Sequence, residues 1–133
     1  MEYKYDDGGR DDYFETKYKK DRTNDCVIRA IAIATGRDYL TIWKELFSLS
    51  TKMGFMPNDQ KCYEEYLELL GWVKNKPLRK INGKKYQVKK LPINKNKSYI
   101  FQTTRHLTAI IDGEHRDIWD CGNWCANSYY TKG

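Results

Sequence analysis

The sequence lacks most of the features that mark membrane, secreted or disordered proteins. No apolar run approaches the ~20 residues that a membrane-spanning helix needs, and the opening MEYKYDDGGRDDYFE contains no apolar signal core. Its 40% hydrophobic and 14% aromatic content argues against a disordered chain. We therefore expect one cytoplasmic domain spanning residues 1–133, with no membrane association.

Cysteine and histidine are scarce. The chain has four cysteines and two histidines, which are Cys26, Cys62, Cys121, Cys125, His106 and His115. Reducing conditions in the cytoplasm argue against disulfides. A zinc site would have to combine Cys121 and Cys125, spaced C-x3-C, with His115 and Cys62, and no second closely spaced pair supports that set. We therefore expect no metal site and no cofactor.

Acidic residues are absent between Leu69 and Ile111, although the whole chain carries a net charge of +6. The basic residues concentrated there are Lys74, Lys76, Arg79, Lys80, Lys84, Lys85, Lys89, Lys90, Lys95 and Lys97. Such a segment fits an acidic host-protein partner or, more simply, a solvated surface that keeps the protein soluble. Few aromatic residues and no arginine cluster accompany it, so nucleic acid is not the expected partner.

Apolar periodicity divides the chain into a helical part and a strand-rich part. After an N-terminal arm (residues 1–22), the pattern predicts helices at about 26–34, 38–49 and 58–70, all within a helical part that spans 23–71. Turn signals in 72–133 separate expected strands at 85–89, 99–103, 106–111 and 116–120. Helices followed by a small antiparallel sheet predict the α+β class.

The stretch TNDCVIRAIAIATG places one thiol, Cys26, at the start of a helix that is apolar on every side except Arg29. A thiolate is the nucleophilic form of cysteine, and both a helix N-terminus and a neighbouring imidazolium lower a thiol pKa. His106 opens a predicted strand and can supply the imidazole. The order of a helix-start cysteine, a strand-start histidine and a following acid is typical of papain-like cysteine peptidases.

Two carboxylates, Asp117 and Asp120, are candidates for the group that orients the imidazole. In IIDGEHRDIWD, a strict two-residue turn at Asp112–Gly113 places His106 opposite Trp119, with Asp117 sharing its face. A loop with an odd number of residues instead places His106 opposite Asp120. The sequence leaves both registers open.

The stretches NDCVIRAIAIATGRDY, RHLTAIIDGEHRDIWD and YKYDDGGRDDYF resemble a family of small papain-like cysteine peptidases encoded by bacteriophages, most of them uncharacterised. The resemblance covers nearly the whole chain. It implies a papain-like core with Cys26 as nucleophile, His106 as base and Asp120 as third member, Asp117 being the alternative. It also suggests Asn24, with the Cys26 backbone N–H, as the oxyanion donor pair.

These features together predict a papain-like cysteine-dependent hydrolase in the cytoplasm of a host bacterium. The expected activity is that of a peptidase, isopeptidase or amidase that forms a thioester on Cys26 of a peptide or protein substrate. An amine acceptor in place of water would make the same site an acyl transferase. The alternative is a phage-encoded binding protein that inhibits or redirects a host factor through the basic 74–97 surface.

Overall fold

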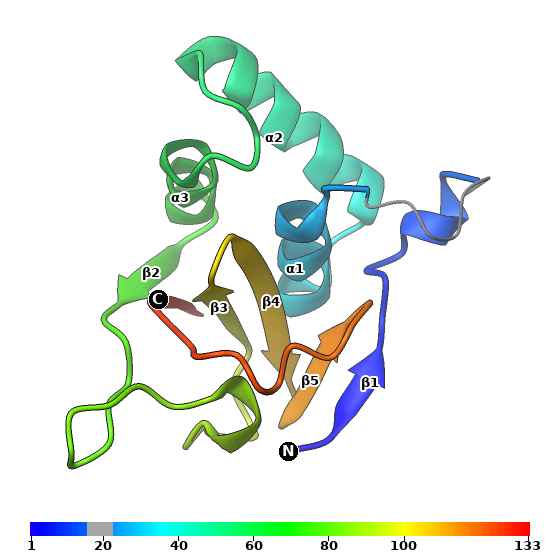
Figure 1. Cartoon of the computed structure of the whole chain (residues 1–133). Coiled ribbons are helices and arrows are strands. Elements are labelled where there is room, and N and C mark those ends of the chain that lie inside the picture. The colour runs from blue at the N-terminus through cyan, green and yellow to red at the C-terminus, as the bar shows by residue number, and fades with distance from the viewer. Residues whose placement is uncertain (16–22) are drawn as a thin grey trace.

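The computed structural model describes residues 1–15 and 23–133. In this part of the chain, three α-helices and a six-stranded sheet form an α+β fold, which confirms the predicted class (Figure 1). The helices are α1 (Cys26–Thr35), α2 (Tyr39–Met53) and α3 (Gln60–Leu69), and two single-turn 3-10 helices are η1 (Arg10–Asp12) and η2 (Val88–Lys90). The strands are β1 (Tyr3–Tyr5), β2 (Trp72–Asn75), β3 (Tyr99–Thr103), β4 (His106–Ile111), β5 (Glu114–Asp117) and β6 (Tyr129–Lys132).

The three helices form where the apolar pattern and capping residues place them. Asp38 caps α2 by accepting a hydrogen bond from the Thr41 N–H, and Asp59 caps α3 in the same way. The second helix is longer than predicted and ends at Gly54, whose φ of 77° closes it. Asp25 precedes α1, but its side chain makes no capping hydrogen bond. This carboxylate has a different role, described below.

The sheet has the strand order β1-β5-β4-β3-β6-β2. The expected strands 99–103 and 106–111 are confirmed as β3 and β4, which form an antiparallel pair. The expectation of a wholly antiparallel sheet is wrong, because β1 from the N-terminal arm pairs in parallel with β5. The arm is therefore part of the sheet, while residues 16–22 of it lie outside the described residues.

The other strand predictions need correction. Residues 85–89 form no strand, since they contain only two isolated bridges, from Lys85 to Arg79 and from Gln87 to Cys125, and the start of η2. The last predicted strand, 116–120, occurs earlier, as β5. Two further strands, β2 and β6, carry no clear local signal, and they pair with each other over Trp72–Asn75 and Tyr129–Lys132. Their strand conformation comes from this long-range pairing.

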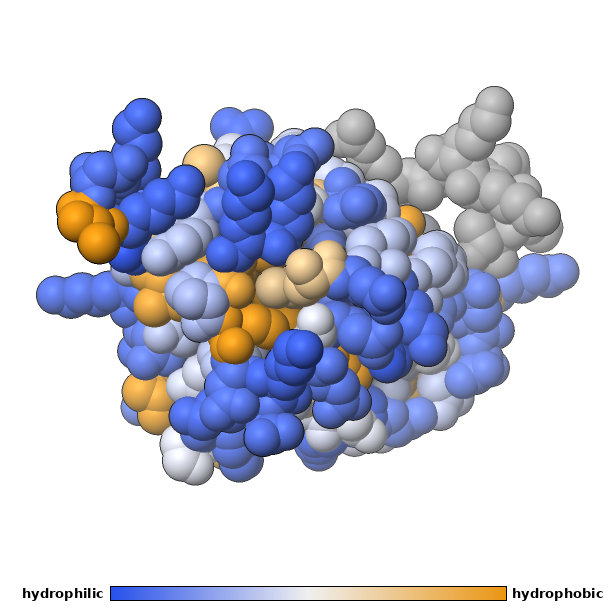
Figure 2. All heavy atoms as spheres, turned by 90° about the horizontal axis from the view of Figure 1, so that it is seen from below, coloured by the Kyte–Doolittle hydropathy of each residue, from blue (hydrophilic) through white to orange (hydrophobic). Residues whose placement is uncertain are grey.

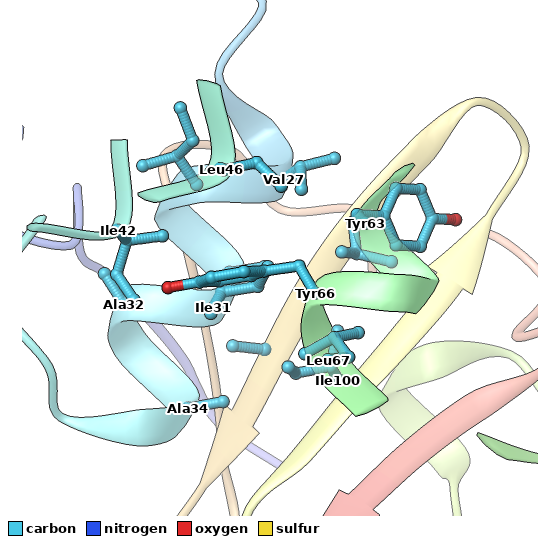
Figure 3. Close-up of a cluster of buried hydrophobic side chains, with 14 of the residues drawn as sticks. Val27, Ile31, Ala32, Ala34, Ile42, Leu46, Tyr63, Tyr66, Leu67 and Ile100 are labelled. Atoms are coloured by element: carbon cyan, nitrogen blue, oxygen red, sulfur yellow. The ribbon is translucent and has the colours of Figure 1, made fainter. Parts of the chain in front are cut away.

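The helices cover one face of the sheet, and α1 packs directly across β4 (Figure 1). Between these layers, apolar side chains of all three helices meet inward-facing residues of the sheet such as Ile100 (Figure 3). Leu107 of β4 belongs to the same core. Because α1 contacts the sheet on one side and α2 on another, its sides are covered by protein. This explains why the helix has no polar face.

The opposite face of the sheet is covered by irregular segments. Alternate residues of β3 and β4 point there and pack in a second core with the segments around residues 88–91 and 126, and the buried members are Val88, Leu91, Tyr99, Phe101, Ile110 and Ala126. The basic segment supplies part of this cover while several of its lysines, such as Lys89 and Lys90, remain exposed. From below, hydrophilic side chains surround a smaller hydrophobic area (Figure 2). Within the described residues, no helix is both long enough and apolar enough to cross a membrane.

Candidate active site

Cys26 and His106 line the same cleft, which has a volume of about 600 Å³. Cys26 is the first residue of α1, and His106 is the first residue of β4, the strand on which α1 packs. Both residues are partly exposed. The packing of a helix start against a strand start therefore brings together a thiol and an imidazole that are far apart in the sequence.

Asp117 contacts the Nε2 atom of the His106 ring. The Nε2 atom of His106 lies 2.6 Å from Oδ2 of Asp117. This pairing follows from a two-residue turn, because Ile111 pairs directly with Glu114 in the β4–β5 hairpin. Continuing that register places Trp119 opposite His106, and their ring centroids lie 4.9 Å apart. Of the two registers that the sequence allows, the structure has the two-residue turn.

Asp120 does not occupy the expected position next to His106. Its side chain is 61% exposed, and its Oδ1 atom accepts a hydrogen bond of 2.8 Å from the Gly122 N–H. The nearer imidazole is that of His115, whose Nδ1 lies 3.8 Å away. Strand β5 ends at Asp117, so the chain has left the hairpin before Asp120. Asp120, the third member that the resemblance implied, is therefore corrected to Asp117, the alternative.

Several donors hold the Asp117 carboxylate in place. Thr108 donates a hydrogen bond of 2.6 Å to Oδ2, and the Ile118 N–H donates one of 2.7 Å to Oδ1. Burial favours the neutral acid, but hydrogen bonds from His106 and these donors outweigh it and lower the pKa of Asp117. Asp117 is therefore an anion at neutral pH, fixed in orientation by its neighbours.

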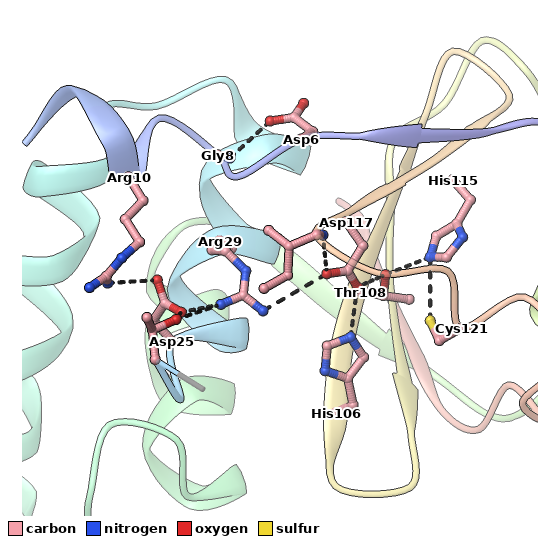
Figure 4. Close-up of polar contacts among 12 residues, drawn as sticks. Asp6, Gly8, Arg10, Asp25, Arg29, His106, Thr108, His115, Asp117 and Cys121 are labelled. Carbon is pink, nitrogen blue, oxygen red and sulfur yellow. Dashed lines mark hydrogen bonds and ion pairs between the residues drawn. The ribbon is translucent and has the colours of Figure 1, made fainter. Parts of the chain in front are cut away.

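Arg29 connects Asp117 to a second buried carboxylate, Asp25 (Figure 4). One guanidinium nitrogen pairs with Asp25, and the other lies 3.8 Å from Oδ1 of Asp117. Asp25 also accepts hydrogen bonds from Arg10, at 3.0 Å, and from the Tyr39 hydroxyl. Arg29 is only 5% exposed. The one charged residue of helix α1 thus lies behind the candidate site and pairs with its carboxylate.

The pKa values of the thiol and the imidazole shift in opposite directions. Burial tends to raise the pKa of Cys26, but hydrogen bonds with the His106 ring and the Leu107 backbone N–H lower it overall. Burial tends to lower the pKa of His106. Hydrogen bonds to Asp117, Cys121 and Cys26 raise it to about 11. Both shifts favour a thiolate next to an imidazolium.

Asn24, the predicted oxyanion donor, does not line the cleft that contains Cys26. It is exposed, has a φ of 55°, and lines a neighbouring cavity of about 310 Å³. The cleft instead contains other amide and hydroxyl groups, from Asn58, Gln60, Tyr63, Gln102 and Asn127. The Tyr63 hydroxyl accepts a hydrogen bond of 2.6 Å from Gln102. Burial raises the pKa of Tyr63 to about 12, so this hydroxyl keeps its proton at neutral pH.

Cys121 is the site residue that sequence reasoning missed. It is fully buried, its sulfur lies 3.3 Å from Nε2 of His115, and it lies near the rings of both histidines (Figure 4). One feature of the sequence could have indicated that Cys121 lies near His106, since it directly follows Asp120, the acid expected to orient the imidazole. The zinc set considered from the sequence is not assembled, because Cys62 lies in the helical core and Cys125 is exposed.

Trp119 and Trp124 extend the site beyond the His106 ring. Their centroids are 5.1 Å apart, and both side chains are partly exposed. Trp119 lies at the surface against His106 and covers one side of the imidazole. Such cover limits the access of water to the His106–Asp117 hydrogen bond.

Comparisons of the chain with protein-family profiles, with curated proteins and with solved structures find no match in any of the three.

Proposed function

We propose that the protein is a papain-like, cysteine-dependent acyl hydrolase with Cys26 as nucleophile, His106 as general acid and base, and Asp117 as the orienting carboxylate. The observation that carries the proposal is the arrangement around His106. Its Nε2 lies 2.6 Å from Oδ2 of Asp117, and its ring lines the same cleft as the Cys26 thiol, whose pKa it lowers. This is the nucleophile–base–orienter geometry that acyl transfer through a thioester requires.

In the first half of the reaction, the Cys26 thiolate attacks an acyl carbon, and the carbonyl π electrons move to oxygen. The tetrahedral intermediate collapses, the C–N bond breaks, and the His106 imidazolium donates its proton to the leaving amine. A thioester on Cys26 remains. In the second half, His106 accepts a proton from water, hydroxide adds to the thioester, and the carboxylic acid and the Cys26 thiolate are released. An amine in place of water would give acyl transfer.

Two groups are placed to stabilise the developing oxyanion. One is the backbone N–H of Cys26 in the first turn of α1, where helix N–H groups have no partner within the helix. The other is the protonated Tyr63 hydroxyl, which lines the same cleft and is positioned by Gln102. The Cys26 N–H is thus kept from the predicted donor pair, and the Tyr63 hydroxyl takes the place of Asn24.

Site-resolved alkylation with iodoacetamide tests the proposal. At neutral pH, followed by peptide mass spectrometry, Cys26 should react faster than the other three cysteines, and His106→Ala should remove that advantage. Cys125 is the internal control, because it is the exposed cysteine whereas Cys26 is only partly exposed. Faster reaction of Cys125 would show that exposure alone controls reactivity and would contradict the proposal.

A binding function through the basic 74–97 segment is the second candidate. It is favoured by the exposure of most of the lysines in this segment, on the side of the sheet away from the helices. A partner with an acidic surface would fit them. Cys26→Ala separates the two candidates in a host-cell assay, because a binding protein keeps its effect with this variant and a hydrolase loses it. The bacteriophage source rests on the sequence resemblance and stays a prediction.

A further inference from the structure

The environment of Cys121 goes beyond what the proposed hydrolase mechanism uses. One nitrogen of His106, one carboxylate oxygen of Asp117 and the sulfur of Cys121 all lie within 4.8 Å of one another, and Asp117 and Cys121 are buried. In the described part of the chain, this is the one group of three such side chains that meets this distance. The three residues come from the start of β4, the end of β5 and the loop that follows β5.

We propose that His106, Asp117 and Cys121 form a binding site for a thiophilic divalent cation such as Zn²⁺ or Co²⁺. An imidazole, a carboxylate and a thiolate are the ligand types that Zn²⁺ takes, whereas Mg²⁺ and Ca²⁺ favour oxygen ligands alone. Zinc–ligand bonds of about 2.0–2.3 Å place ligand atoms roughly 3–4 Å apart. The observed group is already close to that size, and small side-chain movements would complete it.

Residues that contact these three side chains hold them in orientation, as the hydrogen-bond partners of metal ligands do. Thr108 donates to the same Asp117 oxygen that faces His106, at 2.6 Å, and the His115 ring contacts the Cys121 sulfur at 3.3 Å. Arg29 lies near the other Asp117 oxygen, 3.8 Å away. The oxygen Oδ2 is therefore the one turned toward the other two ligands.

Occupation of this site would compete with the thiol chemistry, a consequence that rests on the proposed function. A cation bound to Nε2 of His106 takes the lone pair of that nitrogen, so the ring cannot carry protons on both nitrogens. It also replaces the hydrogen bond to Asp117. The cation would then hold both the base and the orienting carboxylate of the proposed mechanism, at the cleft that also contains Cys26. The site would thus act as a metal-dependent inhibitory switch.

Co²⁺ is the probe that tests the site directly. Metal-free, reduced full-length protein titrated with CoCl₂ should develop a thiolate-to-cobalt charge-transfer band and the visible bands of tetrahedral Co²⁺. Cys121→Ser should lose the charge-transfer band, whereas Cys125→Ser, four residues along the same loop and exposed, should retain it. Cys26→Ala should retain it as well. Circular dichroism of each variant confirms that the fold is kept.

Two results would overturn the proposal. One is the absence of a charge-transfer band in the wild-type protein. The other is a band that persists in Cys121→Ser and disappears in Cys26→Ala, which would place the cation on Cys26 and His106 instead. This readout needs no catalysis, so it stands even if the hydrolase proposal fails.

A second measurement tests the inhibitory switch. One equivalent of Zn²⁺ should slow alkylation of Cys26 severalfold in the wild type and leave the alkylation rate in Cys121→Ser unchanged. Equal slowing in both proteins would contradict the switch.

Discussion

Nε2 of His106 and Oδ2 of Asp117 are 2.6 Å apart, and this contact depends on the two-residue turn that joins β4 and β5. A turn one residue longer would move the whole face of β5 to the other side of the sheet. The side chain next to the imidazole is thus decided by the register of one hairpin. That register also distinguishes two aspartates that lie only three positions apart.

The two aspartates can be separated by matched substitutions. Asp117→Asn removes the negative charge next to His106, so the ring loses the partner that stabilises its protonated form. Hydrolysis of an activated ester, and alkylation of Cys26 at neutral pH, should fall by at least tenfold. Asp120→Asn changes an exposed side chain and should leave both rates within about twofold. Equal loss in the two variants would count against Asp117 as the orienting residue.

The pH dependence of Cys26 alkylation follows from the two pKa shifts. Because the pKa of Cys26 is lowered, its alkylation rate should reach a plateau at a pH below the ordinary thiol value of 9.0. Acyl transfer should then decline near pH 11, where His106 loses its proton. In His106→Ala, the midpoint of the alkylation curve should move to higher pH. A midpoint that does not move would show that the imidazole has no part in activating the thiol.

Acid stability should depend on the buried carboxylates. The folded-state pKa values of Asp25 and Asp117 are lowered from 3.8, so their contribution is present above that value and is lost as the pH falls through the folded pKa. The wild-type free energy of unfolding, measured in urea, should therefore decrease below about pH 4. Asp117→Asn should lessen this decrease. An equally steep decrease in that variant would show that Asp117 is not one of the groups responsible.

His106 makes a contribution of the opposite sign. Its pKa rises from 6.5 to about 11 on folding, so the stability it supplies is complete below pH 6.5 and is lost as the pH approaches 11. In His106→Gln, the decline of stability between these values should be smaller than in the wild type. Thermal unfolding recorded across this range measures the difference, and parallel curves for the two proteins would contradict it.

Arg29 should be far more important for stability than a surface arginine. Arg29→Met leaves two buried carboxylates without their shared cation, and breaking a buried pair in this way costs about 3–5 kcal/mol. Arg37 pairs with Glu45 at an exposed position, so Arg37→Met should cost about 1 kcal/mol or less. Urea unfolding of both variants provides the comparison. Similar losses would mean that the Asp25–Arg29–Asp117 group contributes little to the fold.

The Tyr63 hydroxyl can be tested against its neighbour on the same helix. Tyr63→Phe removes a donor from the cleft and should lower kcat for ester hydrolysis by tenfold or more, while alkylation of Cys26 stays within about twofold. Tyr66→Phe removes a hydroxyl that bonds Glu45 and Arg37 away from the cleft, and it should leave kcat unchanged. An unchanged kcat in Tyr63→Phe would exclude this hydroxyl as an oxyanion donor.

The sequence by itself determined the local parts of this protein. Helical periodicity with Asp38 and Asp59 located the helices, although the last turn of α2 up to Met53 was not predicted, and turn signals located β3 and β4. These signals act within a few residues. The position of Cys26 at a helix start and of His106 at a strand start could also be read locally. These two residues are therefore the part of the candidate site that sequence reasoning placed correctly in its elements.

Tertiary structure decided the rest, for physical reasons that span the chain. Strands β1, β2 and β6 exist because distant segments pair with them, and their short sequences carry no independent signal. The choice of Asp117 over Asp120 needed the hairpin register. The position of Cys121 beside the two histidines needed the path of the loop after β5, and the pairing of Arg29 with Asp117 needed α1 packed on the sheet. Each is a contact between elements, which no single segment of the sequence specifies.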